Sequence, residues 1–355
     1  MSKAAIVLTT RGNYAKFKKV IPRLNIGVDL VIGGELLLKD RVTNLFGVNG
    51  HRVYFDVRGD TTESMGKSIG LAVSEFSTAF NALKPDVVFL VGDRFETIGA
   101  AIAANTNRIP IAHLEGGEVS GSLDDGFRRA ITELSTYHFP ATEQAGRNIK
   151  KDHVYVVGST SIDNLLDDTK TPEDIHELQI KSGAGGFVDI NKPFLLIIYH
   201  PDTSFDCDTD VDFMIEAIRE LNIPTIVLNS NLDSGSDAVS SKFRIYRDTF
   251  KPNNVHFFKS LPIEYYSVLL KRTSCIVGNS SSGIREACFT GTPNVSVGDR
   301  QINRESGENT IYAKNGDIYT AIRKQLNNGK YKANMLYGDG HAGEKIGEIM
   351  SCILA

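Results

Sequence analysis

The sequence predicts an α/β protein built from two doubly wound parallel sheets. Short β-branched runs alternate with longer segments of helical period, and a polar stretch interrupts this alternation near the middle of the 355 residues. Strands that alternate with helices typically form βαβ units and a parallel sheet. Chains longer than about 250–300 residues usually divide into domains. We therefore expect two α/β domains of comparable size.

The first half contains six strand candidates separated by helical segments. They are residues 4–10, 29–34, 51–57, 86–93, 109–117 and 154–159. The clearest helix is predicted over residues 61–84, because apolar residues recur there at steps of three and four and form one stripe that can pack on the sheet. The stripe consists of Met65, Ile69, Ala72, Phe76, Phe80 and Leu83.

The alternation stops at residues 167–192, a polar stretch with prolines and a glycine cluster that is typical of a linker. It resumes with strands at 193–200, 224–230, 255–260, 274–280 and 293–299, and with helices near 208–221, 236–250, 262–271 and from 283. The predicted domains are residues 1–170 and 190–332. Residues 333–355 end in an amphipathic helix that could cross back to the first domain.

The composition argues against several classes of protein. A formal net charge of −4 gives no electrostatic reason to expect nucleic acid. The four cysteines are widely spaced without a CxxC, so neither a zinc site nor a disulfide framework is predicted. No run approaches the roughly 18 apolar residues of a membrane span, and the first apolar run is too short for a signal peptide. We expect a cytoplasmic protein without a membrane partner.

A predicted anion site follows the strand at 274–280. In doubly wound sheets, ligands bind beyond the carboxyl ends of the strands. The segment "GNSSSGIREA" opens a helix there, so its backbone N–H groups and hydroxyls can receive a phosphate. The candidate phosphate ligands are Asn279, Ser280, Ser281, Ser282 and Gly283. Glu286 could serve the helix start or accept hydrogen bonds from a ribose. This segment is neither a GxxxxGK[ST] P-loop nor a GxGxxG dinucleotide turn, so ATP hydrolysis and nicotinamide chemistry lose support, and no cofactor is predicted.

Three other strand ends carry candidate binding or catalytic groups. Arg11 follows the first strand and is a planar donor suited to a diphosphate. Arg300 lies in a charged loop that either contacts phosphate or base, or is a solvated turn. His200 ends an apolar strand, where it is either a satisfied buried histidine or a proton relay.

Asp93, Glu115 and Asp125 come from two adjacent strand ends and the following helix start, so they can share one site. Like charges in a partly dry site raise at least one carboxyl pKa toward neutrality, as acid/base catalysis at cellular pH requires. A magnesium site and a salt-bridged surface, with Arg94, Arg128 and Arg129 as partners, are competing interpretations. No metal site is predicted. His113 and Glu118 are expected to orient these groups, and the adjacent glycines to leave room for a ligand.

The motifs together resemble one enzyme family. "TTRGNY", "GDRFE", "HLEGGEVSGSLDDGFRRAITELS", "YHPDT" and "GNSSSGIREACFTGTPNVSVGDRQINRESGEN" are similar to the UDP-N-acetylglucosamine 2-epimerase family from about residue 5 to 350, and "HLEGGE" followed by "LDDGFRR" resembles its hydrolysing branch. The resemblance implies two Rossmann-like domains of the glycosyltransferase-B type, an active site in the interdomain cleft, and a homodimer or homotetramer.

The resemblance also implies roles for the candidate residues. Asp93, Glu115 and Asp125 would be the acid/base carboxylates, and His200 the histidine of the cleft. Four residues would hold UDP, and these are Arg11, Ser281, Ser282 and Glu286.

The expected reaction converts UDP-N-acetylglucosamine and water to N-acetylmannosamine and UDP through a 2-acetamidoglucal. The alternatives are a non-hydrolysing 2-epimerase, a hydrolysing enzyme acting on a 6-deoxy or diacetamido UDP-sugar, a glycosyltransferase of the same architecture, and a sugar-nucleotide sensor without catalysis. The glycosyltransferase would need an acceptor site and usually uses one base rather than three clustered acids.

Overall fold

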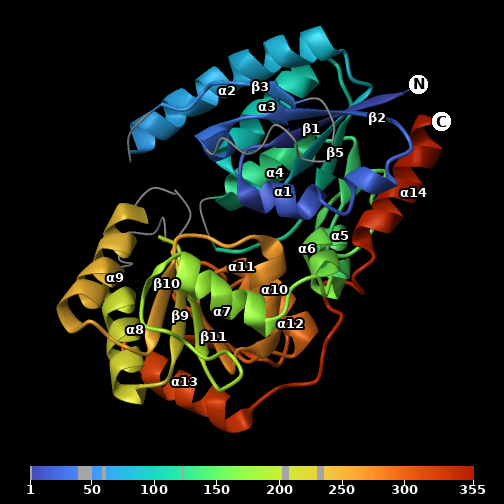
Figure 1. Cartoon of the computed structure of the whole chain (residues 1–355). Coiled ribbons are helices and arrows are strands. Elements are labelled where there is room, and N and C mark those ends of the chain that lie inside the picture. The colour runs from blue at the N-terminus through green and yellow to red at the C-terminus, as the bar shows by residue number, and fades with distance from the viewer. Residues whose placement is uncertain (1, 39–49, 58–60, 122–123, 202–207, 230–235) are drawn as a thin grey trace. The chain divides into compact units, whose positions relative to one another are not determined.

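The computed structural model describes all residues except 1, 39–49, 58–60, 122–123, 202–207 and 230–235 (Figure 1). The chain forms two compact α/β units. Unit 1 contains Met1–Val119, Leu123–Asp163 and Gly338–Ala355, and unit 2 contains Ser120–Ser122 and Asn164–Tyr337. The N-terminal part of unit 1 thus ends at Asp163, whereas the sequence prediction extended the first domain to residue 170.

Unit 1 is built on a six-stranded sheet in the order β3-β2-β1-β4-β5-β6, and every neighbouring pair is parallel. The strands are β1 (Lys3–Leu8), β2 (Gly27–Ile32), β3 (Gly50–Arg52), β4 (Val87–Val91), β5 (Ile111–Leu114) and β6 (Tyr137–Phe139). The strand order reverses between β1 and β4. In a Rossmann-like sheet this reversal is the point where ligands bind, beyond the carboxyl ends of the two strands.

Helices cover both faces of this sheet. The helices of unit 1 are α1 (Arg11–Phe17), η1 (Ile21–Arg23), η2 (Gly34–Leu38), α2 (Thr62–Leu83), α3 (Phe95–Thr106), α4 (Asp124–Leu134), α5 (Glu143–Asn148), α6 (Thr160–Asp163) and α14 (Ala342–Leu354). Ile6 and Leu8 pack in one core with α1 and α14, while Ala5 and Val7 pack in a second core with α2 and α3. Successive side chains of a strand point to opposite faces of the sheet, so β1 contributes residues to both cores.

The C-terminal helix α14 belongs to unit 1 because the carboxylate of Asp163 binds its first turn. The backbone N–H groups of Ala342 and Gly343 donate to the two oxygens of Asp163, at 3.1 and 2.7 Å. Asp163 is only 4% exposed, and Ile346 and Met350 of α14 lie fully buried in the unit 1 core. A helix start leaves N–H groups without intrahelical partners, and this carboxylate satisfies two of them.

Substituting Asp163 with alanine is expected to lower the free energy of unfolding by about 1–2 kcal/mol, because two buried N–H groups lose their acceptor. Limited proteolysis should then cleave near α14 sooner, and urea unfolding gives the stability change. Asp168→Ala is the matched control, because the Asp168 side chain is 86% exposed and forms an ion pair with Lys271 at 2.6 Å. Equal proteolysis of the two variants would contradict this account of α14.

Unit 2 has a seven-stranded sheet in the order β13-β12-β11-β8-β9-β10-β7, parallel except for the antiparallel pair of β10 and β7. The strands are β7 (Ala184–Gly185), β8 (Leu195–Ile198), β9 (Thr225–Leu228), β10 (Val255–Phe258), β11 (Cys275–Gly278), β12 (Asn294–Val297) and β13 (Thr310–Ala313). From β8 the chain builds outward through β9 and β10, then returns to place β11 on the other side of β8. The reversal of unit 2 therefore lies between β8 and β11.

Unit 2 packs α8, α9 and α13 against its sheet through an apolar core that includes Met214, Phe243 and Ile318. Its helices are η4 (Asn164–Leu166), α7 (Pro172–Lys181), α8 (Asp208–Leu221), α9 (Ser236–Phe250), α10 (Ile263–Arg272), α11 (Ser281–Ile284), α12 (Glu286–Thr290) and α13 (Asp317–Asn328). Among the described residues, no helix combines the length and apolar character that a membrane span requires.

The structure confirms the α/β class and corrects several predicted elements. The strand expected at 51–57 is reduced to β3, and the one expected at 154–159 is only an isolated bridge between His138 and Val154. The short strands β6 and β13 were missed. The helix expected from residue 283 is two short helices, α11 and α12, that meet at Arg285. Three- and four-residue strands at sheet edges carry too little periodicity to be recognised.

Candidate active site

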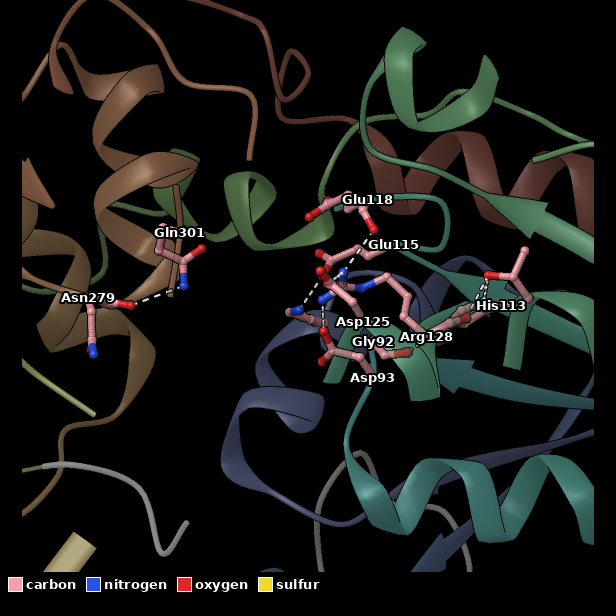
Figure 2. Close-up of polar contacts among 11 residues, drawn as sticks. Gly92, Asp93, His113, Glu115, Glu118, Asp125, Arg128, Asn279 and Gln301 are labelled. Atoms are coloured by element: carbon pink, nitrogen blue, oxygen red, sulfur yellow. Dashed lines mark hydrogen bonds and ion pairs between the residues drawn. The ribbon is translucent and has the colours of Figure 1, made fainter. Parts of the chain in front are cut away.

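Three carboxylates lie in the segments that follow the carboxyl ends of strands β4 and β5 in unit 1. Asp93 follows β4, Glu115 follows β5, and Asp125 lies in the first turn of α4. The guanidinium of Arg128 forms ion pairs with both Asp93 and Asp125 (Figure 2). The structure therefore brings Asp93 and Asp125 together, as the sequence predicts.

Arg128 is buried, with 2% of its side chain exposed, and its Nη1 also donates to the carbonyl of Glu118 at 2.8 Å. It was expected only as a partner in a salt-bridged surface. Its buried position makes it part of the site instead, because its positive charge offsets the repulsion between the two carboxylates. Arg94, another of the three predicted partners, binds Glu96 through Nε at 3.1 Å.

Glu115 is held from several directions. Its backbone has φ 61°, a left-handed conformation that is uncommon for a residue other than glycine and often marks a functional site. Its N–H donates to the carbonyl of Phe139 at 2.9 Å, and the hydroxyl of Ser159 donates to Oε1 at 2.7 Å. Lys16 forms an ion pair with Oε2, and the carboxylate is only 2% exposed. Glu115 is thus a buried, oriented carboxylate.

Sequence reasoning missed Lys16 and Ser159. Lys16 reaches the site because α1 begins right after β1, at the reversal of the sheet. Thr10 and Asn13 fix that start with a capping box, in which Thr10 Oγ1 accepts from the N–H of Asn13 at 3.2 Å and Asn13 Oδ1 accepts from the N–H of Thr10 at 3.0 Å. A lysine on the first helix after β1 was the signal available in the sequence.

His113 supports the loop of Asp93 rather than Glu115. Its Nε2 lies 2.8 Å from the carbonyl of Gly92, and its Nδ1 lies 3.3 Å from the hydroxyl of Thr132 (Figure 2). Burial lowers the pKa of His113 to about 4, so the imidazole is neutral at pH 7 and can donate from Nε2. The predicted role of orienting the adjacent glutamate is replaced by a link between the ends of β4 and β5.

The two glycines after Glu115 serve packing. A Cβ on Gly116 would lie 2.8 Å from Nδ1 of His113. Gly117 has φ 79°, and a Cβ there would lie 2.2 Å from the carbonyl oxygen of Ala145. Gly116 therefore lets the loop pass close to the side chain of His113, and Gly117 lets it pass close to the backbone of Ala145.

Acid is expected to destabilise unit 1 through its buried histidines. Burial also lowers the pKa of His138 to about 4, and neither of its ring nitrogens has a hydrogen-bond partner among the described residues. An unfolded histidine has a pKa of about 6.5, so the unfolded state binds more protons below that pH. Stability contributed by the neutral form is therefore present above pH 6.5 and is lost as the pH falls toward 4, by up to about 3 kcal/mol for each fully buried histidine.

His138→Phe is expected to weaken this pH dependence, because phenylalanine fills the site without titrating. Urea unfolding at pH 7, 6 and 5 measures the effect. His51→Phe is the control, since 44% of the His51 side chain is exposed. An unchanged slope in His138→Phe would show that His138 does not contribute.

The described part of the chain contains no group of three or more His, Cys, Asp or Glu arranged to hold a metal ion. Basic side chains occupy the positions that a cation would take: Arg128 binds two of the carboxylates and Lys16 binds the third. This arrangement favours acid/base chemistry over the competing magnesium interpretation.

In unit 2, His200 and Asn279 meet at the reversal between β8 and β11. Oδ1 of Asn279 accepts from the N–H of His200 at 2.7 Å, and Nδ2 donates to the carbonyl of His200 at 2.7 Å. His200 is 8% exposed and Asn279 fully buried. Asn279 was predicted as a phosphate ligand, yet both polar atoms of its side chain bind the backbone of His200.

The serine cluster after β11 is arranged around Ser280 and Ser282. Ser280 caps α11, since its hydroxyl accepts from the N–H of Ser282 at 3.3 Å. The hydroxyls of Ser282 and Tyr266 are hydrogen-bonded. Burial, followed by the nearby charge of Glu286, raises the pKa of Tyr266, which therefore stays protonated. Tyr266, on α10, was not predicted from the sequence.

The remaining residues that the sequence predicts to bind the substrate lie at different positions and are buried to different extents. Ser281 is the first residue of α11 and is half-buried, while Glu286 is the buried first residue of α12. A Cβ on Gly283 would lie 2.4 Å from Oδ1 of Asn294, so this glycine permits close packing. Arg300 is half-buried after β12. The side chain of Arg11 lies outside the described residues.

Several known proteins are similar to this chain. The family model described as UDP-N-acetylglucosamine 2-epimerase matches residues 33–351. A UDP-N,N'-diacetylbacillosamine 2-epimerase (hydrolyzing) of Legionella pneumophila is 32% identical, covering 99% of this chain and 96% of that protein. A UDP-N-acetylglucosamine 2-epimerase of Neisseria meningitidis is 27% identical, covering 96% and 92%.

The solved structures agree on the fold. The crystal structure of UDP-GlcNAc 2-epimerase from Neisseria meningitidis bound to UDP-GlcNAc superimposes with a TM-score of 0.80 at 20% identity, covering 98% of this chain and 99% of that chain. The enzyme from Methanocaldococcus jannaschii in complex with UDP-GlcNAc and UDP gives a TM-score of 0.79 at 20% identity, covering 99% of both chains. With a family model that covers residues 33–351, this chain belongs to the UDP-N-acetylglucosamine 2-epimerase family.

Proposed function

We propose that this protein is a hydrolysing 2-epimerase of UDP-activated 2-acetamido sugars. The observation that carries the proposal is the arrangement of Asp93, Glu115 and Asp125 at the carboxyl edge of the unit 1 sheet, with Arg128 bound to Asp93 and Asp125 and Lys16 bound to Glu115. Buried, oriented carboxylates are suited to moving a proton to and from carbon. Family membership and the hydrolysing relatives at 32% identity support the same conclusion.

The reaction needs UDP to leave before or while the proton moves. The hydrogen on C2 of a 2-acetamido sugar has no adjacent carbonyl, so it becomes acidic only when C1 gains cationic character. The C1–O bond breaks with its electron pair going to UDP, a carboxylate takes the C2 proton, and a C1–C2 double bond forms. A second carboxyl then protonates C2 from the opposite face, and water adds its oxygen to C1 and releases a proton. The product is the free, inverted sugar.

The binding of UDP is assigned to residues after β1 and β11. Arg11, Ser281 and Ser282 would hold the diphosphate, and Glu286 would accept hydrogen bonds from the ribose. Acid/base catalysis by positioned side chains contributes about 10²–10⁴ in rate, so stabilising the departing diphosphate must supply much of the rest. We place the reaction in the cytoplasm, in a homodimer or homotetramer whose mass light scattering would measure.

The proposal also includes the identity of the sugar in the UDP-sugar substrate. Two relatives named as hydrolysing epimerases of N,N'-diacetylbacillosamine nucleotides are each 32% identical to the chain, whereas the Neisseria meningitidis relative named for UDP-N-acetylglucosamine is 27% identical. We therefore place UDP-N,N'-diacetylbacillosamine first among the candidate substrates and UDP-N-acetylglucosamine second.

Incubation with each UDP-sugar in D₂O, followed by NMR, tests the reaction and the substrate together. Deuterium at C2 of a free sugar of inverted configuration, with free UDP, is the expected result. Deuterium in an intact nucleotide sugar would show that UDP re-adds, which is the non-hydrolysing reaction. No UDP release from any candidate would overturn the proposal and favour the glycosyltransferase or the sensor. The better substrate has the higher kcat/KM.

A further inference from the structure

The side-chain amide of Asn279 forms hydrogen bonds with both the N–H and the carbonyl of His200, as the backbone of a neighbouring strand would. One of its atoms accepts from the His200 N–H and another donates to the His200 carbonyl, both at 2.7 Å. The main chain adds a third contact, because the N–H of Asn279 donates to the carbonyl of Ile198 at 3.2 Å. These contacts extend the pairing of β8 and β11 past the last paired residues, Ile198 and Gly278.

The surroundings of Asn279 keep this arrangement fixed. Nε2 of Gln301 donates to the carbonyl of Asn279 at 3.0 Å (Figure 2). Gly278 has φ 135°, and a Cβ there would lie 1.9 Å from the carbonyl oxygen of Ile198, so only glycine lets the two strands come this close. Asn279 is fully buried and Gln301 is 4% exposed.

The contacts of Asn279 fix the two peptide groups of His200. The next residue is Pro201, which has no N–H to donate. A carboxamide that fixes both the N–H and the carbonyl of one residue restricts both backbone dihedrals next to its Cα, and so the direction of its side chain. Misplacement of a catalytic group by about 1 Å can cost about 100-fold in rate.

We propose that Asn279 is a positioning residue that sets the orientation of the His200 imidazole, and that it does not bind UDP. The inference rests on the proposed function, and on the catalytic role that the family resemblance implies for His200. It replaces the phosphate contact predicted for Asn279 from the sequence, because both polar atoms of the side chain already bind the backbone of His200.

Asn279→Asp tests the proposal with the smallest change of shape. The variant keeps the acceptor for the His200 N–H and replaces the donor with an oxygen that repels the His200 carbonyl. We expect kcat to fall about 10- to 100-fold while the Kd for UDP, measured by calorimetry, stays within about twofold. In a His200→Ala background, the same substitution should change kcat by less than about twofold, because a residue that acts only through His200 has nothing left to position.

Asn309→Asp is the matched control. Asn309 is also buried in unit 2, and its Nδ2 donates to the carbonyl of Thr292 at 2.8 Å. The Asn309→Asp variant also loses a hydrogen bond from a side-chain amide to a backbone carbonyl, but this bond does not involve His200. The kcat of this variant should therefore stay within about threefold of the wild type. Asn279→Ala is a second variant that introduces no buried charge, and it should show the same loss of kcat with UDP binding retained.

The imidazole resonances of His200, assigned by comparison with His200→Ala, test the positioning independently of turnover. They should shift in Asn279→Asp and not in Asn309→Asp. A tenfold weaker binding of UDP with unchanged kcat at saturation would make Asn279 a ligand and overturn the proposal. Additive losses in the double variant, or unshifted His200 resonances, would also overturn it. If wild type releases no UDP from any sugar, the proposed function fails, while the resonances and the UDP titration still decide the role of Asn279.

Discussion

Arg128→Met is expected to lower the free energy of unfolding by about 3–5 kcal/mol and to remove more than 99% of turnover. The guanidinium is 2% exposed and binds Asp93 and Asp125, whose side chains are 25% and 13% exposed. Removing one partner of a buried ion pair leaves charges without compensation, which costs about this much. Methionine keeps most of the apolar volume, so the loss reports the charge and its hydrogen bonds. Urea unfolding and UDP release measure the two effects.

Arg129→Met is the matched control, because Arg129 is the next residue of α4 and is exposed. Its stability should change by less than about 0.5 kcal/mol, as for most surface substitutions. Added guanidinium at millimolar concentration should restore part of the activity of Arg128→Met if the loss comes from the missing charge. Full activity in Arg128→Met would show that Asp93 and Asp125 need no shared cation.

Glu115→Gln is expected to lower kcat about 10²- to 10⁴-fold with UDP binding unchanged. Glutamine keeps the shape of the side chain and an acceptor for Ser159, but it cannot take up or deliver a proton. Deuterium uptake at C2 should fall in parallel with UDP release, because both follow proton transfer in the proposed reaction. Steady-state kinetics in D₂O and calorimetry with UDP give the two measurements.

Glu133→Gln controls for the change of charge, since Glu133 lies on α4 and its side chain is 67% exposed. It should retain at least half of the wild-type kcat. A kcat for Glu115→Gln within threefold of wild type would remove Glu115 from the proton transfers. UDP release that persists without deuterium uptake would separate hydrolysis from epimerisation and assign Glu115 to the second process.

Local pattern was sufficient to predict most of the elements and the main carboxylates. The helix predicted at 61–84 is α2, and four of the six residues of its predicted stripe are buried. Strands of continuous apolar residues, such as β4 and β8, are equally clear because they are covered on both faces. Polar residues at strand ends mark the binding edge of a parallel sheet, and this rule alone pointed to Asp93, Glu115 and His200.

The sequence by itself determined the α/β class and the candidate site loops, because hydrophobic period and strand-end polarity are local properties. The tertiary structure decided the partners. Lys16 reaches Glu115 from 99 residues away, and Asp163 binds the first turn of α14 from 180 residues away. It also assigned Asn279 to the backbone of His200, 79 residues distant. Such pairs depend on strand order, which places β1 beside β4 and β8 beside β11, and no spacing along the chain encodes that adjacency.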